Sequence, residues 1–246
     1  MTVPLYLGCA VLMTALVSMA AYAILGPRRD ADASRKGTRF LLGVGDFLVH
    51  WIFWFLSPAE RLLLRLGFTP DALNFAGLGF GLVSGVALGL GRLELGGWAI
   101  AAGGLCDVLD GRIARRRGLA SSYGKFIDSS LDRFAEVLVF LGLVAYFRNR
   151  ALGAFLAAST LAGSLLVSYV QARGETVQVS GAGGLMQRAE RLVSTFLICI
   201  LDPPLCAWMR WTPGTLVVAG LAVLAPATFG TAVYRTFWTA RRLRKL

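Results

Sequence analysis

Apolar stretches of about 20 residues recur along this chain, and each is long enough to cross about 30 Å of hydrocarbon as a helix. They are uniformly apolar and rich in Leu, Ala and Gly, whereas a transmembrane β-barrel needs alternating segments of about ten residues. Hydrophobic residues make up 56% of the 246 residues and charged residues 16%, which excludes a water-soluble globule of this size. The sequence therefore predicts an all-α, polytopic membrane protein.

The formal net charge of +11 raises the possibility of nucleic-acid binding, but the basic residues gather at the ends of the apolar stretches. This distribution is typical of cytoplasmic loops in membrane proteins, where it also attracts anionic lipid headgroups. We therefore expect membrane lipids, and no nucleic acid, as partners. The clusters are Arg28, Arg29, Arg35, Lys36 and Arg39, then Arg115, Arg116 and Arg117, then Arg241, Arg242, Arg244 and Lys245.

The chain is predicted to have three parts. Residues 1–39 form an extra N-terminal transmembrane helix and a basic linker, and the helix is uncleaved because its positive charge follows the apolar run. Residues 40–68 are apolar but interrupted by charges and crowded with aromatic side chains, which indicates a helix lying in the membrane interface. Residues 69–246 form a six-helix membrane domain with a basic C-terminal tail.

The six helices of the third part begin at TPDALN, where Thr69 is the expected N-cap and Pro70 the first helical residue. Seven crossings that start outside put the C-terminus in the cytoplasm, as the basic tail requires. The glycines of GLGFGLVSGVALGLG are interpreted as sites of close helix packing. The expected core spans are 71–91, 96–115, 121–147, 151–173, 185–208 and 212–235.

Four aspartates lie close together in CDVLDGRIARRRGLASSYGKFIDSSLDRF, residues 106–134. An unpaired carboxylate in mid-membrane costs about 2.5–3.5 kcal/mol, so these four require compensation. Asp107 and Asp110 share one helical face, and Asp128 and Asp132 share another. Because a short turn joins the two helices, we expect antiparallel neighbours whose acidic pairs meet at the cytoplasmic end.

Three kinds of compensation are open: arginine, protonation or metal. A salt-bridge network would use Arg112, Arg115 and Arg133. Oxygen ligands without His or Cys instead select Mg²⁺ or Mn²⁺, and four carboxylates suit two divalent cations that clamp phosphate oxygens. Small residues on the same faces would let a substrate approach the backbone, and Arg115 would add a charge for a phosphate.

The same stretch resembles the signature of the CDP-alcohol phosphotransferase family, DxxDGxxAR followed by eight residues and GxxxDxxxD, with every fixed position present. The resemblance extends from about Ser57 to Arg235. It implies that an acceptor hydroxyl attacks the β-phosphorus of a CDP-linked lipid such as CDP-diacylglycerol and that CMP leaves. Residues 1–39 lie outside this family core.

The resemblance also implies a role for each matched residue. Asp107, Asp110 and Asp128 look like metal ligands, and Asp132 looks like the general base that also touches the second metal. The nucleotide pocket would use Asp107, Gly111, Ala114, Arg115 and Gly124.

The acceptor is the open part of the interpretation. The segment SYVQARGETVQVSGAGGLMQRAERL resembles prokaryotic phosphatidylinositol-phosphate and phosphatidylglycerophosphate synthases, and Ser168, Arg173 and Arg235 match their phosphate-binding positions. Gln171 stands where the inositol-phosphate branch has a lysine. Arg188 and Arg191 are two further predicted acceptor residues, or basic residues that reach toward lipid headgroups.

Inositol phosphate is the favoured acceptor, and glycerol 3-phosphate, an uncharged alcohol or a second lipid are alternatives. A non-catalytic membrane protein that binds cations is an alternative of another class. By analogy with the family we expect a homodimer in the inner or plasma membrane of a prokaryote. Its site would face the cytoplasm, with the N-terminus outside.

Overall fold

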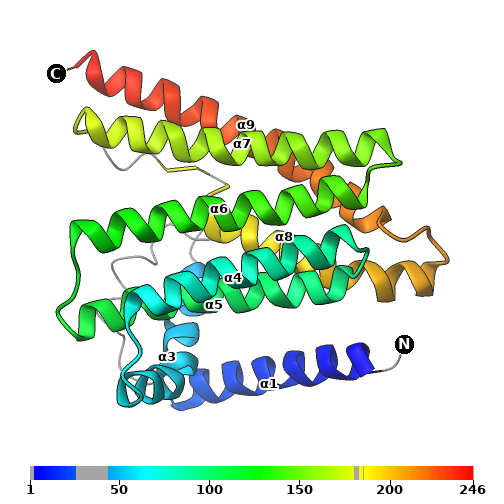
Figure 1. The fold of residues 1–246 in the computed structure, drawn as a ribbon, viewed down its shortest axis with the longest axis horizontal. Helices are drawn as coiled ribbons and strands as arrows, with labels where there is room; N and C mark the ends of the chain where they lie inside the picture. The colour runs from blue at the N-terminus through cyan, green and yellow to red at the C-terminus, as the bar shows by residue number, and fades with distance from the viewer. Residues whose placement is uncertain (1–2, 26–43, 180–182, 185, 246) are drawn as a thin grey trace. The chain divides into compact units, whose positions relative to one another are not determined.

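The computed structural model describes residues 3–25, 44–179, 183–184 and 186–245, and within these ranges it contains helices and no strands (Figure 1). The chain divides into two units, Met1–Phe68 and Thr69–Leu246. The first unit holds α1 (Val3–Leu25) and α3 (Val44–Arg65). The second unit holds α4 (Pro70–Gly89), α5 (Leu93–Arg116), α6 (Ser122–Tyr146), α7 (Ala151–Thr176), α8 (Arg188–Met209) and α9 (Thr215–Leu243).

These helices confirm the all-α prediction, and the six expected core spans coincide with α4 to α9. The predicted start of one span at Leu185 lies outside the described residues. The same holds for the linker at 26–39 and for the first residues of the predicted interfacial segment, 40–43.

The first unit is held together by aromatic and polar contacts between its two helices. The Trp51 indole nitrogen donates a hydrogen bond to the Ser18 hydroxyl at 3.1 Å. The Tyr22 ring lies 5.4 Å from the Phe47 ring and 5.7 Å from the Trp54 ring, measured between centroids. Such edge-on and tilted aromatic pairs stabilise a helix pair beyond their buried area.

The six helices of the second unit close into a ring. Around it, α4 packs on α6, α6 on α7, α7 on α9, α9 on α8, α8 on α5, and α5 again on α4. Figure 1 shows α7 and α9 side by side, with α6 between this pair and α4. Each helix therefore buries two flanks against other helices.

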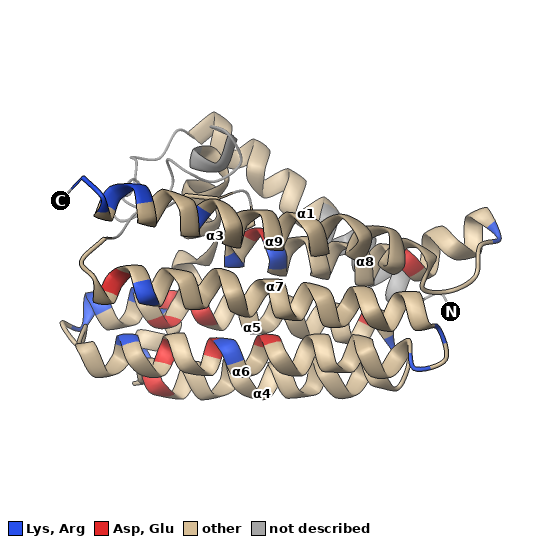
Figure 2. Ribbon diagram, turned by 90° about the horizontal axis from the view of Figure 1, so that it is seen from above, with Lys and Arg blue, Asp and Glu red and all other residues tan. Residues whose placement is uncertain are grey.

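The apolar core fills one end of this ring. It includes Leu88 and Leu93 at the α4–α5 turn, Phe147 after α6, and Val217 at the start of α9. Apart from Glu94 in the first turn of α5, the charged residues of α5 and α6 lie toward the other end, in the half of the bundle that holds the basic end of α9 (Figure 2). The fold thus separates an apolar end from a charged end.

One expectation about neighbouring helices needs correction. We expected α5 and α6 to pack directly because only a short turn joins them, but they share few contacts and α4 packs on both. Their acidic residues still meet, as described below. The approach of α4 to α6 is close, since a Cβ added to Gly81 would lie 2.7 Å from the Ala135 Cβ of α6.

The start of α4 confirms the predicted cap. Thr69 is the N-cap, its hydroxyl accepts a hydrogen bond from the Ala72 amide at 3.2 Å, and Pro70 is the first helical residue. Ser121 caps α6 in the same way through the Gly124 amide, at 3.1 Å. Both caps lie at the charged end, so they fix where the two helices begin beside the acidic cluster.

Five of the described helices are long and apolar enough to cross a membrane, and they support an integral membrane protein. They comprise Pro70–Gly89, α7, α8, α9 and also Phe47–Arg65 of α3, whose place in the interface therefore stays a prediction. The helices α5 and α6 fall outside this group because they carry the charged stretch.

Candidate metal centre and active site

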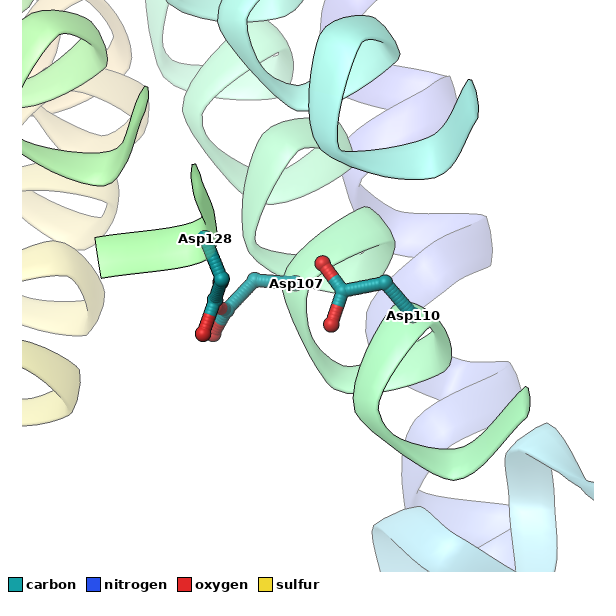
Figure 3. A group of neighbouring side chains, drawn as sticks. All are labelled: Asp107, Asp110 and Asp128. Carbon is teal, nitrogen blue, oxygen red and sulfur yellow. The ribbon is translucent and has the colours of Figure 1, made fainter. Parts of the chain in front are cut away.

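Three of the four predicted aspartates form a cluster at the charged end of the second unit. Asp107 and Asp110 come from α5 and Asp128 from α6, and one carboxylate oxygen of each lies within 4.8 Å of the others. Figure 3 shows the Asp107 and Asp128 carboxylates close together, with Asp110 on the next turn of α5. The predicted meeting of the two helices at their acidic residues is therefore present.

The cluster has the chemistry of a hard-cation site. Asp110 is 5% exposed, and its Oδ2 is buried without a hydrogen-bond partner among the described residues. A buried carboxylate oxygen without a donor is unfavourable unless a cation completes its environment. Three convergent carboxylates without nitrogen or sulfur ligands suit Mg²⁺ or Mn²⁺, so these residues fit such a group.

The fourth aspartate is linked to the cluster through an arginine of α8. Arg188 Nη1 lies 2.9 Å from Asp107 Oδ1, and its Nη2 directly contacts Asp132 Oδ1. The guanidinium thus bridges a predicted metal ligand and the predicted general base. Asp132 lies beside the three-carboxylate cluster, one turn further along α6 than Asp128.

The predicted nucleotide residues lie around the end of α5 and the start of α6. Gly111, Ala114 and Gly124 are half-buried, and Arg115 is exposed. A Cβ at Gly111 would lie 3.3 Å from Arg115 Nη1, and a Cβ at Gly124 would lie 3.4 Å from the Ser121 hydroxyl. The glycine at each position therefore leaves room beside a polar side chain.

One predicted acceptor residue of α7, Gln171, contacts the predicted acceptor residue of α9, Arg235. Arg235 is 4% exposed, and its Nη1 donates to Gln171 Oε1 at 2.8 Å and to the Val167 carbonyl at 3.3 Å. Its Nε donates to the Gly183 carbonyl at 3.2 Å. Gln171 therefore holds Arg235 through its amide oxygen, as a lysine could not.

The two other predicted acceptor residues of α7 differ in exposure. Ser168 is half-buried, and its hydroxyl donates to the Ser164 carbonyl one turn earlier, at 3.0 Å. Arg173 is exposed near the end of the helix. Ser168 lies on the same face of α7 as Gln171, since residues three apart share a helical face.

Arg191 was predicted to bind the acceptor, but its side chain is buried and hydrogen-bonded within the protein. It is 1% exposed, its Nε and Nη2 donate to Glu136 at 2.8 and 3.2 Å, and its Nη1 donates to the Met186 carbonyl at 2.9 Å. Every nitrogen of the guanidinium thus has a partner within the protein. This position does not support direct contact between Arg191 and an acceptor.

Glu136 and Asn74 are site residues that the sequence interpretation missed. Both are buried, and both line a cleft that Asp107, Asp132 and Arg188 also line. Glu136 continues the four-residue spacing that runs through Asp128 and Asp132, so its helical position was a usable signal. For Asn74 the only signal was its polar character one turn into an apolar helix.

The fold and this site together define a class: a polytopic membrane protein with a carboxylate centre for divalent cations at one end of a helix ring. The family model for CDP-alcohol phosphatidyltransferase matches residues 68–232. The chain belongs to the CDP-alcohol phosphatidyltransferase family, and it is an enzyme of this class embedded in a membrane.

Several characterised proteins are similar to this chain. The phosphatidylinositol phosphate synthase of Mycobacterium marinum is 34% identical over 189 residues, which cover 75% of this chain and 80% of that protein. The archaetidylinositol phosphate synthase of Methanothermobacter thermautotrophicus is 32% identical over 193 residues, with 77% and 91% covered.

Solved structures show the same likeness. The phosphatidylinositol phosphate synthase of Mycobacterium tuberculosis with CDP-DAG bound is 30% identical, with a TM-score of 0.65 over 74% of this chain and 92% of the other. A crystal structure of the same synthase in complex with manganese and citrate gives a TM-score of 0.66 at 30% identity, covering 74% and 88%.

Proposed function

We propose that this enzyme transfers a phosphatidyl group from CDP-diacylglycerol to a hydroxyl of inositol phosphate and releases CMP. The observation that carries the proposal is the convergence of Asp107, Asp110 and Asp128 within 4.8 Å, with Asp132 beside them. The similar proteins named as phosphatidylinositol phosphate synthases support this donor and acceptor.

The metal site would hold two divalent cations, Mg²⁺ or Mn²⁺. Asp107, Asp110 and Asp128 would be the ligands, and Asp132 would reach the second ion. When bound, the two cations offset the charge of the diphosphate and of the leaving CMP. The manganese in the structure of the tuberculosis synthase supports this choice of metal.

Asp132 would take the proton of the acceptor hydroxyl. The hydroxyl oxygen then forms a bond to the β-phosphorus of the donor, the bond from that phosphorus to the bridging oxygen breaks, and CMP leaves with the electron pair. A carboxylate positioned for this proton transfer contributes about 10²- to 10⁴-fold to such a rate. The Arg188 contact holds the Asp132 carboxylate at the edge of the cluster.

The nucleotide would bind across the end of α5 and the start of α6. The missing side chains at Gly111 and Gly124, and the short one at Ala114, leave the backbone accessible to a flat base and its ribose. Arg115 would pair with a phosphate of the donor, since a guanidinium offers two parallel donors to phosphate oxygens.

The acceptor phosphate would bind between α7, α8 and α9, at Ser168, Gln171, Arg173, Arg188 and Arg235. Gln171 brings no charge of its own and uses one Arg235 donor, so a phosphate would meet one cation fewer than in the inositol-phosphate branch. Glycerol 3-phosphate is the second candidate acceptor, ahead of an uncharged alcohol or a second lipid. Inositol phosphate and glycerol 3-phosphate both carry the phosphate that the arginines would bind.

The site would face the cytoplasm of a prokaryote, with the C-terminus inside and the N-terminus outside. The basic residues Arg115, Arg116 and Arg117 and the basic end of α9 lie at the aspartate end, which supports this orientation. We also propose a homodimer, by analogy with the family alone.

A CMP-release panel tests the proposed function. Purified protein with CDP-diacylglycerol and Mn²⁺ or Mg²⁺ would be offered inositol 1-phosphate, inositol, glycerol 3-phosphate, serine and phosphatidylglycerol in turn, and the lipid product identified by mass spectrometry. We expect release with inositol 1-phosphate. Release with glycerol 3-phosphate instead would establish the second candidate, and metal binding without release for any acceptor would favour a non-catalytic cation-binding protein.

A further inference from the structure

Two charged contacts connect α6 and α8, one above the other. The first joins Asp132 to Arg188 and belongs to the proposed catalytic site. The second joins Glu136 to Arg191, one turn deeper on α6 and three residues further along α8. Because residues three and four apart lie on the same face of a helix, the two contacts form successive rungs between the same pair of faces.

The second rung is almost completely buried. Glu136 is 2% exposed and Arg191 1%, and two hydrogen bonds of 2.8 and 3.2 Å join the carboxylate to the guanidinium. Arg133 adds a third contact to Glu136, at 3.1 Å. The carboxylate thus has donors on both oxygens, which is the arrangement that holds a side chain in one geometry.

A buried ion pair of this kind is a poor device for stability. Removing two charges from water costs several kcal/mol each, and well-packed apolar residues in the same place are often as stable or more stable. Inside a membrane the charged groups are still less favourable, and they mark functional positions. Stabilisation of the fold therefore does not account for the Glu136–Arg191 pair.

Arg191 also controls the start of the helix that carries Arg188. Its Nη1 donates to the Met186 carbonyl, and the Met186 amide donates to the Thr231 hydroxyl of α9 at 3.2 Å. Since α8 begins at Arg188, these bonds fix the chain directly before the arginine that bridges Asp107 and Asp132. A rotation of α8 would break the contact between Glu136 and Arg191 and would displace Arg188 at the same time.

We propose that Glu136 is a positioning residue, which acts through Arg191 to set Arg188 between Asp107 and Asp132. It contacts no reacting atom in this assignment, and its role rests on the proposed function. A Cβ added at Gly111 would meet Arg115 and one added at Gly124 would meet Ser121, so the atoms nearest to these two nucleotide residues belong to neither Glu136 nor Arg191. The effect therefore falls on kcat and not on the KM for CDP-diacylglycerol.

The decisive variant removes both charges at once. Glu136→Met with Arg191→Met replaces the pair by flexible apolar side chains that can fill the space. We expect a melting temperature close to that of the wild type and an unchanged KM for CDP-diacylglycerol, but a kcat lowered about 10- to 100-fold, as for a small displacement of catalytic groups. Lys125→Ala, which removes an exposed ion pair between α6 and α7, is the matched control and should keep the wild-type kcat.

A second variant, Glu136→Asp, keeps the charge and shortens its reach by one methylene. It should keep the melting temperature and lower kcat, by less than the double variant does. A double variant or a Glu136→Asp variant with wild-type kcat would overturn the proposal. A variant that loses its fold would overturn it too, because the pair would then serve stability.

The outcome also separates this proposal from the proposed function. A wild type that releases no CMP with any acceptor of the panel removes the proposed function. An active wild type whose double variant is equally active removes only the positioning role of Glu136.

Discussion

At the scale of single residues, four aspartates of the same residue type are proposed to have two different roles. Asp107, Asp110 and Asp128 converge on one another, and Asp132 lies beside them, joined to Asp107 through Arg188. The first three are therefore suited to bind cations together, and the fourth to hold or accept a proton. Substitutions by asparagine, which keep the shape and remove the charge, distinguish the two roles.

Asp132→Asn should lower kcat for CMP release by about 10²- to 10⁴-fold, because an amide cannot accept the hydroxyl proton. Manganese should still bind to the purified variant at Asp107, Asp110 and Asp128, and the second ion, which Asp132 would reach, should bind more weakly. Glu94→Gln, the same type of change at the opposite end of α5, serves as the control and should be silent. A variant at Asp132 that keeps full turnover would remove this residue as the base.

The limits of sequence interpretation are visible in these same residues. The spacing of the aspartates predicted both their faces and their convergence, because helical periodicity fixes them. Arg188 was predicted at the acceptor, but its contacts with two aspartates were not predicted, since partners from distant helices depend on packing. Glu136 was missed because its partner, Arg191, lies 55 residues away in the sequence, and only the three-dimensional structure shows that the two side chains pair.

At the scale of the helices, the arrangement of the site depends on how closely α4 and α6 approach. A Cβ added to Gly142 of α6 would lie 2.8 Å from the Gly85 Cα of α4, so two backbones meet directly. This contact confirms that glycines of the α4 stretch serve helix packing, as their abundance predicted. It also keeps Asp128 and Asp132 on α6 within reach of α5.

Gly142→Ala should therefore destabilise the protein by about 1–3 kcal/mol, as overpacking does in tightly packed interiors. Thermal unfolding of the purified protein in detergent measures this effect. Gly79→Ala, where an added Cβ meets nothing within 4 Å, is the matched control. Equal melting temperatures for the two variants would show that the close approach is not required.

The turn between α8 and α9 depends on one buried carboxylate. Asp202 is 0% exposed and accepts hydrogen bonds from the amides of Gly214 and Leu216, both at 2.8 Å, and of Val217 at 3.2 Å. It thus caps α9 from α8. This contact could not be predicted from the sequence, because Asp202 lies 12 to 15 residues before the amides that it binds.

Asp202→Ala should lower the stability by about 2 kcal/mol, because it leaves buried amides at the start of α9 without an acceptor. Asp202→Asn retains one carbonyl oxygen and should lose less. Chemical or thermal unfolding of both variants measures the difference. A result in which the alanine variant is as stable as the asparagine variant would contradict the capping role.

At the scale of the whole molecule, the six helices of the second unit contain every residue of the proposed site. Length and hydropathy predicted the boundaries of these helices to within about three residues, except that α9 runs to Leu243, well past the predicted end at residue 235. They did not predict the ring order, in which α4 contacts both α5 and α6, because sequence neighbours need not pack. Residues 1–39 lie outside the matched family region, 68–232.

A chain that begins at residue 40 should therefore retain CMP release at the wild-type rate, with the same KM for CDP-diacylglycerol. The shortened protein would be compared with the full chain after purification in the same detergent. A well-folded short chain without turnover would show that the N-terminal helix contributes to catalysis.

In the proposed function, the aspartate cluster performs phosphatidyl transfer with bound divalent cations. The most direct measurement is CMP release by the wild type with CDP-diacylglycerol and inositol 1-phosphate, before and after chelation with EDTA and after Mn²⁺ or Mg²⁺ is restored. We predict that turnover falls to background on chelation and returns with the metal. Turnover that persists in excess chelator, or no turnover with metal present, would contradict the claim.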